Sequence, residues 1–420
     1  MPRSQRPDGF IAVQSKTGLA LSENGIFSFF GAMKRHGSGI VSLLDCILQH
    51  TGFTNRPHFY RFLGSSMRSS FRLVCVLTLA FTAPIPAQTF SPEQAKSAFL
   101  KLLDRPKVQA DVKEDAKESE KSGLTYKHWS FASEKKADGT IERVPVLTVS
   151  PARKTGKLPV MIALHGTGGN KEGMTSWLED FARQGIVGVA IDARYHGSRS
   201  GGEKGATAYV AAITRAWKTS EGKLSEHPFY YDTCWDLWRL IDVLESMPDV
   251  DARRIGMMGV SMGGIETWLA ASVDDRVAVA APLIGVQSFR WSLENDKWQG
   301  RANTIKGSHE VAAKDLGEPM VNKKVCRELW SKVIPGILDE FDCPNMIRLF
   351  ANRALFIANG EKDGNCPIEG AKLAFAAAED AFAKTKSKEK LSIDVAMGVG
   401  HQVTAEQRKA AIAFCVKWLK

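Results

Sequence analysis

The sequence predicts an α/β protein with a mostly parallel central sheet and helices on both of its faces. Two observations support this prediction. Short apolar segments rich in β-branched residues alternate with longer segments of helical periodicity along most of the chain. Such alternation implies βαβ crossovers, which place helices on both faces of a parallel sheet. The 420 residues, of which 44% are hydrophobic, can bury a large core.

Residues 1–87 are predicted to lie outside this fold. In residues 67–87, Arg68 and Arg72 precede a short apolar run and a small-residue site ending at Ala87, a pattern typical of a secretory signal peptide. The run is shorter than the roughly twenty residues that a membrane span needs. We therefore interpret Met67 as the true start and residues 1–66 as a disordered over-extension of the reading frame, with a genuine extra segment as the alternative. The mature protein is expected to be periplasmic or extracellular, without a stable membrane anchor.

Charge and cysteine content exclude several kinds of partner. The formal net charge is +10, but residues 1–87 contribute +6 of it, and no basic block follows, so we expect no nucleic-acid partner. Metal-binding spacings of Cys and His are absent from the sequence, and we expect neither a metal nor a cofactor. The mature chain retains five cysteines whose pairing the spacing does not determine, namely Cys234, Cys326, Cys343, Cys366 and Cys415.

The elements of the mature chain follow in order. A helix over 91–104 and a charged, mobile linker are expected within residues 88–140, and the main domain spans 141–420. Strands are predicted at 144–149, 158–164, 185–191, 254–260, 277–283, 354–359 and 391–397. Helices are predicted at 173–183, 229–246, 262–272, 367–383 and 404–419. Residues 287–352 contain three tryptophans and interrupt the alternation, so we expect a helical insertion before the strand at 354–359.

Ser261 is the candidate nucleophile. The stretch "GVSMG" follows a predicted strand, opens a predicted helix and matches G-x-S-x-G, a sharp turn that exposes a serine hydroxyl. Gly259 and Gly263 are expected because a side chain at either position would collide with the neighbouring strand or helix. A plain glycine-rich turn is the alternative interpretation.

A serine hydroxyl needs a base, and the base needs a carboxylate. His401, in "MGVGHQVT", comes just after the last predicted strand, and Asp363, in "FIANGEKDGNCP", comes just after the preceding one. Both lie where parallel strands end, in the chain order serine, acid, histidine. Glu361 in the same loop and Asp394 in the last strand are the competing acids, and Asp363 is favoured because it lies at the turn before Gly364.

Two further loops are predicted to complete the site. The loop "LHGTGG" is expected to supply the backbone N–H of Thr167, which would bind the oxyanion together with the N–H of Met262, whereas His165 is interpreted as structural. In "DARYHGSR", Asp192 and Arg194 are expected to form a bracing pair. Candidate pocket residues are Tyr195, His196 and Trp291, and Arg199 is a further possible member.

These motifs resemble those of the α/β-hydrolase family over residues 140–420. The resemblance is carried by "LHGTGG", "DARYHGSR", "GVSMGG", "NGEKDGNCP" and "GVGHQ" in the family's order. The chain is most similar to the group containing dienelactone hydrolases, acetyl xylan esterases and the catalytic domains of prolyl oligopeptidases. It has Ser261 where dienelactone hydrolases use a cysteine. It also lacks the length for the β-propeller of the prolyl oligopeptidases.

The expected function is that of an exported serine hydrolase that cleaves short-chain carboxylic esters through an acyl-enzyme. Its partner would be a small ester, with an acylated carbohydrate as one candidate. The alternatives are a peptidase of the prolyl-oligopeptidase type and a catalytically silent binding protein of the same fold.

Overall fold

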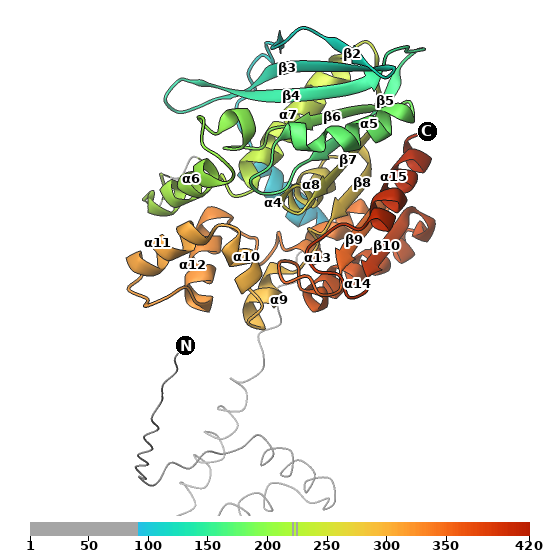
Figure 1. Ribbon diagram of the computed structural model, residues 1–420. Helices are drawn as coiled ribbons and strands as arrows, with labels where there is room; N and C mark the ends of the chain where they lie inside the picture. The colour runs from blue at the N-terminus through green and yellow to red at the C-terminus, as the bar shows by residue number, and fades with distance from the viewer. Residues whose placement is uncertain (1–90, 221, 224–225) are drawn as a thin grey trace, which may run out of the picture. The chain divides into compact units, whose positions relative to one another are not determined.

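The computed structural model describes residues 91–420 except residues 221, 224 and 225 (Figure 1). The predictions for residues 1–66 and for the signal peptide at 67–87 lie outside the described residues. The strands are β1 (Lys113–Glu114), β2 (Ser119–Lys121), β3 (Leu124–Lys135), β4 (Ile141–Pro151), β5 (Leu158–Leu164), β6 (Val187–Ile191), β7 (Val250–Val260), β8 (Val277–Leu283), β9 (Ala354–Gly360) and β10 (Leu391–Ala396). The longer helices are α4 (Pro92–Leu102), α5 (Thr175–Arg183), α6 (Thr207–Lys218), α7 (Tyr231–Ser246), α8 (Met262–Val273), α14 (Ile368–Lys384) and α15 (Ala405–Leu419).

The described strands form a single ten-stranded sheet. Its order is β1-β3-β4-β6-β5-β7-β8-β9-β10, with β2 paired to β3. The six strands β5 to β10 pair with one another in parallel. The strands β1 to β4 form an antiparallel extension, which joins the parallel strands through the antiparallel pair of β4 and β6. The prediction of a mostly parallel sheet covered by helices is confirmed.

The two faces of the sheet bury two separate apolar clusters. On β5, Val160, Ile162 and Leu164 face the cluster that includes α7 and α8, whereas Met161 and Ala163 face the cluster that includes α5 and α15. This alternation follows from the two-residue period of a strand. Because both faces are covered, the central strands read as continuous apolar runs in the sequence. Figure 1 shows α15, in red, beside the sheet, with α8 near its centre.

The linker expected within residues 88–140 is wrong for its second half. The helix α4 is present, with Ser91 as its N-cap. Residues 113–135, however, form β1, β2 and β3, and β3 pairs along most of its length with β4 (Figure 1). The residues of β1 and β2 are exposed and charged, so no apolar alternation announced them. Their pairing with β3 holds them in the sheet.

The insertion over residues 287–352 is helical, as predicted. It contains α9 (Phe289–Glu294), α10 (Gln299–Asn303), α11 (Lys306–Asp315), α12 (Lys323–Val333), α13 (Cys343–Met346) and the 3-10 helix η4 (Ile347–Phe350). Figure 1 shows α10 to α12 at the lower left, in orange, beneath α6. The helix α6, which the sequence analysis did not predict, contacts α11 and α12. The insertion therefore packs on helices of the main domain, namely α6, α8 and α14.

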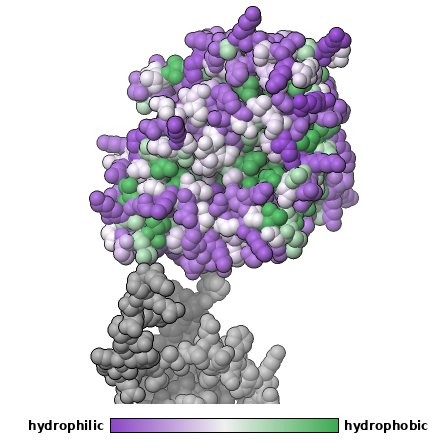
Figure 2. All heavy atoms as spheres, viewed as in Figure 1, coloured by the Kyte–Doolittle hydropathy of each residue, from purple (hydrophilic) through white to green (hydrophobic). Residues whose placement is uncertain are grey.

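The five cysteines of the described chain are free and buried, which resolves the pairing that their spacing left open. Within residues 91–420, apart from the three that are not described, no helix has the length and apolarity to span a bilayer. On the face seen in Figure 2, hydrophilic side chains surround scattered apolar patches.

Candidate active site

Ser261 occupies a sharp turn between β7 and α8. Its φ is 58°, a value that favours glycine, and its N–H donates to the Leu283 carbonyl at 2.9 Å. An added Cβ on Gly259 would lie 2.2 Å from the Gly263 oxygen, and one on Gly263 would lie 2.4 Å from the Leu164 oxygen. Both positions therefore admit only glycine, for the steric reason that the sequence analysis gave.

His401 connects this serine to a buried carboxylate. Its Nε2 lies 2.7 Å from the Ser261 Oγ, and its Nδ1 lies 2.7 Å from the Asp363 Oδ2. Because an ionised carboxylate can only accept, Nδ1 carries the proton and Nε2 is left to accept from the serine hydroxyl. The His401 side chain is 25% exposed, whereas that of Asp363 is fully buried. The partly exposed imidazole of His401 is thus hydrogen-bonded to the buried carboxylate of Asp363.

The Asp363 carboxylate is held on both of its oxygens. While Oδ2 binds His401, Oδ1 accepts the backbone N–H of Asn365 at 2.7 Å and that of Cys366 at 3.0 Å. These amide bonds fix the orientation of the carboxylate.

The two competing acids bind elsewhere. Glu361 accepts the Gly398 N–H at 2.7 Å, which joins the acid loop to the histidine loop. Asp394 accepts from the Gln407 side chain at 3.3 Å. The structure brings His401 together with Asp363, the acid that the sequence analysis favoured.

The segments that carry the expected oxyanion donors flank the serine. An added Cβ on Gly166 would lie 3.6 Å from the Ser261 Cβ, so the loop that contains Thr167 lies against the nucleophile. Met262 is the first residue of α8, where backbone N–H groups have no partner within the helix. The role of these two amides stays a prediction.

Comparison with known proteins places this geometry in context. Residues 101–289 match the family of acetyl xylan esterases (AXE1). YtaP of Bacillus subtilis (strain 168), a relative named as a hydrolase, is 23% identical over 291 residues, which cover 66% of this chain and 84% of YtaP. The structure is similar to an acetyl xylan esterase from Paenibacillus sp. R4, with 19% identity, a TM-score of 0.56, and coverage of 80% of this chain and 96% of the other. Acetyl xylan esterase 1 from Thermoanaerobacterium sp. JW/SL YS485 gives the same identity and coverage, with a TM-score of 0.57.

The protein has the α/β-hydrolase fold. The segment that matches the esterase family includes Ser261 but ends before Asp363 and His401. Asp363 and His401 are therefore candidates for the acid and the base on their geometry alone.

His165 has a structural role, as expected. Its buried ring donates from Nδ1 to the Gly166 carbonyl at 2.8 Å and accepts the Ala193 N–H on Nε2 at 3.1 Å. Burial lowers the pKa of His165 and keeps the ring neutral, which this pair of bonds requires. The ring ties the loop of Thr167 to the segment that follows β6.

The prediction that Asp192 and Arg194 bind each other is wrong. Asp192 instead binds the Lys171 Nζ at 2.9 Å and the Lys171 N–H at 2.8 Å. The Nε of Arg194 lies 2.7 Å from Asp236 of α7. Both charges do brace the loop, but each does so with a partner that is distant in the sequence.

The candidate pocket residues after β6 have other contacts. Tyr195 donates to Glu226 at 2.7 Å, and burial together with that carboxylate raises the pKa of Tyr195 to about 12. His196 is fully buried between the rings of His165 and Tyr209, with its Nδ1 bonded to the Arg194 carbonyl. Burial lowers the pKa of His196 to about 4. These contacts make His196 part of the scaffold.

The side chain of Arg199 is also buried, and it binds Glu142 of β4 and Asp236. It is part of the ionic scaffold behind the loop. The sequence analysis had left this residue as a possible member of the pocket.

Two tryptophans of the insertion differ in burial: Trp291 is partly exposed and Trp330 is buried in the core. Trp291 of α9 is partly exposed and lies against α14, where an added Cβ on Gly370 would be 3.0 Å from its ring. Trp330 is fully buried and donates to His309 at 3.0 Å, so it belongs to the core of the insertion. Trp291 stays a candidate pocket residue, whereas Trp330 is closed off from any substrate.

One group of possible metal ligands lies within the site. Single ligand atoms of Asp363, Cys366 and His401 lie within 4.8 Å of one another, a grouping that no sequence spacing announced. The carboxylate and the imidazole already bind each other, and burial raises the pKa of the Cys366 thiol to about 12. The Arg301 guanidinium also lies 3.2 Å from the sulfur, and its charge repels a cation. These residues suit a proton-transfer pair better than a metal.

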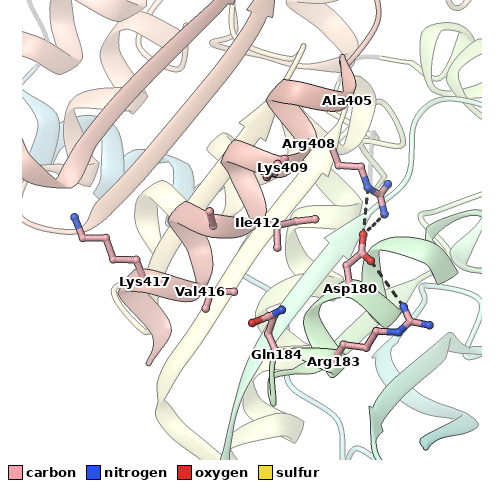
Figure 3. A pocket seen from close by; sticks show the side chains of 10 residues that line it. Asp180, Arg183, Gln184, Ala405, Arg408, Lys409, Ile412, Val416 and Lys417 are labelled. Carbon is pink, nitrogen blue, oxygen red and sulfur yellow. Dashed lines mark hydrogen bonds and ion pairs between the residues drawn. The ribbon is translucent and has the colours of Figure 1, made fainter. Parts of the chain in front are cut away.

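A surface groove lies between α5 and α15 (Figure 3). The ion pair of Asp180 with Arg408 crosses it, Arg183 binds Asp180 within α5, and Ile412 and Val416 contribute its apolar side. None of the three residues Ser261, Asp363 and His401 lines this groove. It is separate from the candidate active site.

Proposed function

We propose that this protein hydrolyses short-chain carboxylic esters through an acyl-enzyme formed on Ser261. The observation that carries the proposal is the hydrogen-bonded chain from Asp363 through His401 to Ser261, with 2.7 Å at each step. A serine hydroxyl at a strained turn, a base within hydrogen-bond reach and a buried acid are the parts that acyl transfer requires. The match to acetyl xylan esterases supports an ester as the substrate.

In the first step, the Ser261 hydroxyl proton passes to the His401 Nε2 while Oγ forms a bond to the acyl carbon. The negative charge that develops on the carbonyl oxygen would be bound by the N–H groups of Thr167 and Met262. The tetrahedral intermediate then expels the alcohol, which takes the proton from His401. Asp363 stabilises the imidazolium and keeps its own charge throughout.

In the second step, water replaces the alcohol. His401 removes a proton from the water, whose oxygen bonds to the acyl carbon, and the bond to Ser261 breaks with return of that proton to Oγ. The products are the carboxylic acid and the free enzyme. Apart from the ester and water, every group that takes part in these two steps belongs to the chain.

The substrate is proposed to carry a short acyl group, acetate to butyrate, on a carbohydrate or an aromatic alcohol. The insertion of residues 287–352 and the partly exposed Trp291 support a confined pocket. The test is kcat/KM for p-nitrophenyl esters from C2 to C12 beside a prolyl-peptide anilide. We expect a maximum at C2 to C4. A maximum at C8 or longer, or faster cleavage of the anilide than of the acetate, would contradict the proposal.

Export is a separate part of the proposal, and it rests on the pattern of residues 67–87. Protein isolated from its own host should begin near Gln88, as determined by mass spectrometry of the intact chain. Recovery of residues 1–66 in the mature protein would refute this part without affecting the proposed chemistry.

A further inference from the structure

Arg301, on α10 of the insertion, is a buried cation that binds only neutral groups. It is 1% exposed, and one nitrogen, NH2, lies 3.2 Å from both the Asn365 carbonyl and the Cys366 sulfur. Its other terminal nitrogen lies 3.4 Å from the Tyr230 hydroxyl. In the described part of the chain, no carboxylate comes within 4.0 Å of this guanidinium. The charge of Asp363 nevertheless acts on the guanidinium from beyond that distance. Burying a charge with only neutral groups in contact is costly, so these partners matter to the fold or to the function.

These partners belong to the turn that holds the catalytic acid. The N–H groups of Asn365 and Cys366 donate to the Asp363 Oδ1, while the carbonyl of Asn365 and the thiol of Cys366 contact Arg301. The turn of residues 363–366 is thus bound by a carboxylate on one side and by a guanidinium on the other. Displacing the turn would move the carboxylate relative to His401.

Gln287 completes the contact between the insertion and the turn. In the amide orientation that satisfies both groups, its nitrogen donates to the Asn365 carbonyl at 2.8 Å and its oxygen accepts from the Arg301 Nε at 3.0 Å. Arg301 and Gln287 therefore share one acceptor on the turn and also bind each other.

The backbone of α10 touches the same turn. An added Cβ on Gly300 would lie 2.0 Å from the Gly364 oxygen and 2.8 Å from the Asn365 Oδ1. Because Gly300 has no positive φ, the constraint is contact with the turn and not backbone conformation. The insertion is therefore in direct contact with the acid loop at two successive residues.

We propose that Arg301 is a positioning residue, which fixes the turn of residues 363–366 so that Asp363 presents Oδ2 to His401. The inference rests on the proposed function, because it assigns Arg301 a role in that reaction. It gives the insertion a part in the chemistry in addition to any part in substrate choice. Arg301 itself contacts neither the reacting atoms nor the imidazole.

The first experiment compares Arg301→Met with Arg353→Met on the full chain, with p-nitrophenyl acetate as the substrate. Arg353 is a matched control because it too binds only neutral acceptors, the carbonyls of residues 271, 272, 274, 277 and 349. We expect Arg301→Met to lower kcat at least about tenfold with KM within about twofold, and Arg301→Lys to restore part of the loss. Arg353→Met should lower the Tm and keep kcat.

The second experiment places Arg301→Met in an Asp363→Asn background. If Arg301 acts only through the acid, its substitution should cost less than about twofold there, because the two effects are not additive. A full, additive loss in this background, or an unchanged kcat in the single variant, overturns the proposal. If Ser261→Ala also keeps ester hydrolysis, the proposed function has failed instead.

A third variant guards against loss of folding in Arg301→Met. Gly300→Ala keeps the charge but pushes on the turn, and we expect it to lower kcat with KM unchanged. The p-nitrophenyl monoester of succinic acid tests the other use of a buried guanidinium, binding of an anionic substrate. If the Arg301 variants raise KM for that ester alone, Arg301 is a specificity residue and the positioning role is wrong.

Discussion

The parallel and antiparallel parts of the sheet differ in what holds them together. The parallel strands are apolar on both faces, and the loops at their carboxyl ends carry Ser261, Asp363 and His401. The antiparallel part pairs with the parallel part through β4 and β6, and a buried ionic network also joins the two, in which Glu134 of β3 and Glu142 of β4 bind arginines of the loop after β6. The comparison teaches that the candidate catalytic residues lie on the parallel part, whereas the buried ionic network joins the antiparallel part to it and is expected to serve stability.

The largest effect should come from the parallel part. Ser261→Ala and His401→Ala should each lower kcat for p-nitrophenyl acetate at least about a thousandfold, because nucleophile and base act as a unit. Circular dichroism should show an unchanged fold. Near-normal turnover by either variant would remove the chemistry from this part of the sheet.

The acid should come next. Asp363→Asn should lower kcat by at least about a hundredfold, since it removes the charge that stabilises the imidazolium and orients its ring. Glu361→Gln is the matched control in the same loop, and it should cost far less because Glu361 binds a backbone amide. The reverse ranking in the same assay would show that the acid is wrongly assigned.

The antiparallel part should respond in stability instead. Asp236 of α7 is buried between Arg194 and Arg199, so Asp236→Asn should lower the free energy of unfolding by about 3–5 kcal/mol. Asp242→Asn, at a partly exposed site on the same helix, should cost about 1 kcal/mol or less. Urea unfolding measures both. A loss of kcat in folded Asp236→Asn as large as that in Asp363→Asn would erase the distinction between the two parts.

The smallest expected effect is a change in how the free energy of unfolding depends on pH, caused by Glu142 of the antiparallel part. Burial alone would raise the pKa of Glu142, but the charges of Arg199 and Arg194 outweigh it and lower the pKa to about 2. The unfolded value is about 4.3, so the ionised group stabilises the fold above that pH, and this contribution is lost as the pH falls toward 2. Glu142→Gln should therefore flatten the pH dependence of unfolding in this window by up to roughly 1.4 kcal/mol per pH unit. An unchanged slope would show that the pair contributes little.

The sequence predicted which three residues the structure brings together, because their proximity depends on their positions along the chain. Ser261, Asp363 and His401 each follow a strand whose apolar run is unmistakable, and parallel strands bring such loops together at one edge. The glycines at 259 and 263 reported a close approach that only glycine permits. None of these inferences required knowledge of distant side-chain pairing.

Two of the missed features depend on pairing in space. Asp192 has Arg194 two residues away, yet it binds Lys171, because the direction of each side chain is set by the turn and not by sequence distance. Arg301 reads as one more arginine of a polar helix, and its contact with the acid turn exists only after the insertion has folded back. The helix α6 is different, because helical spacing of its buried residues is present in the sequence itself. These residues are Tyr209, Ala212, Ile213 and Ala216.

The left-handed backbone of Ser261 has a consequence for the history of the fold. A residue other than glycine at φ 58° is held in a conformation that costs free energy, so glycine at this position should give a more stable protein that has lost its nucleophile. Selection for stability alone would therefore remove the serine. The serine at this turn is therefore explained by a function of its hydroxyl and not by the stability of the fold.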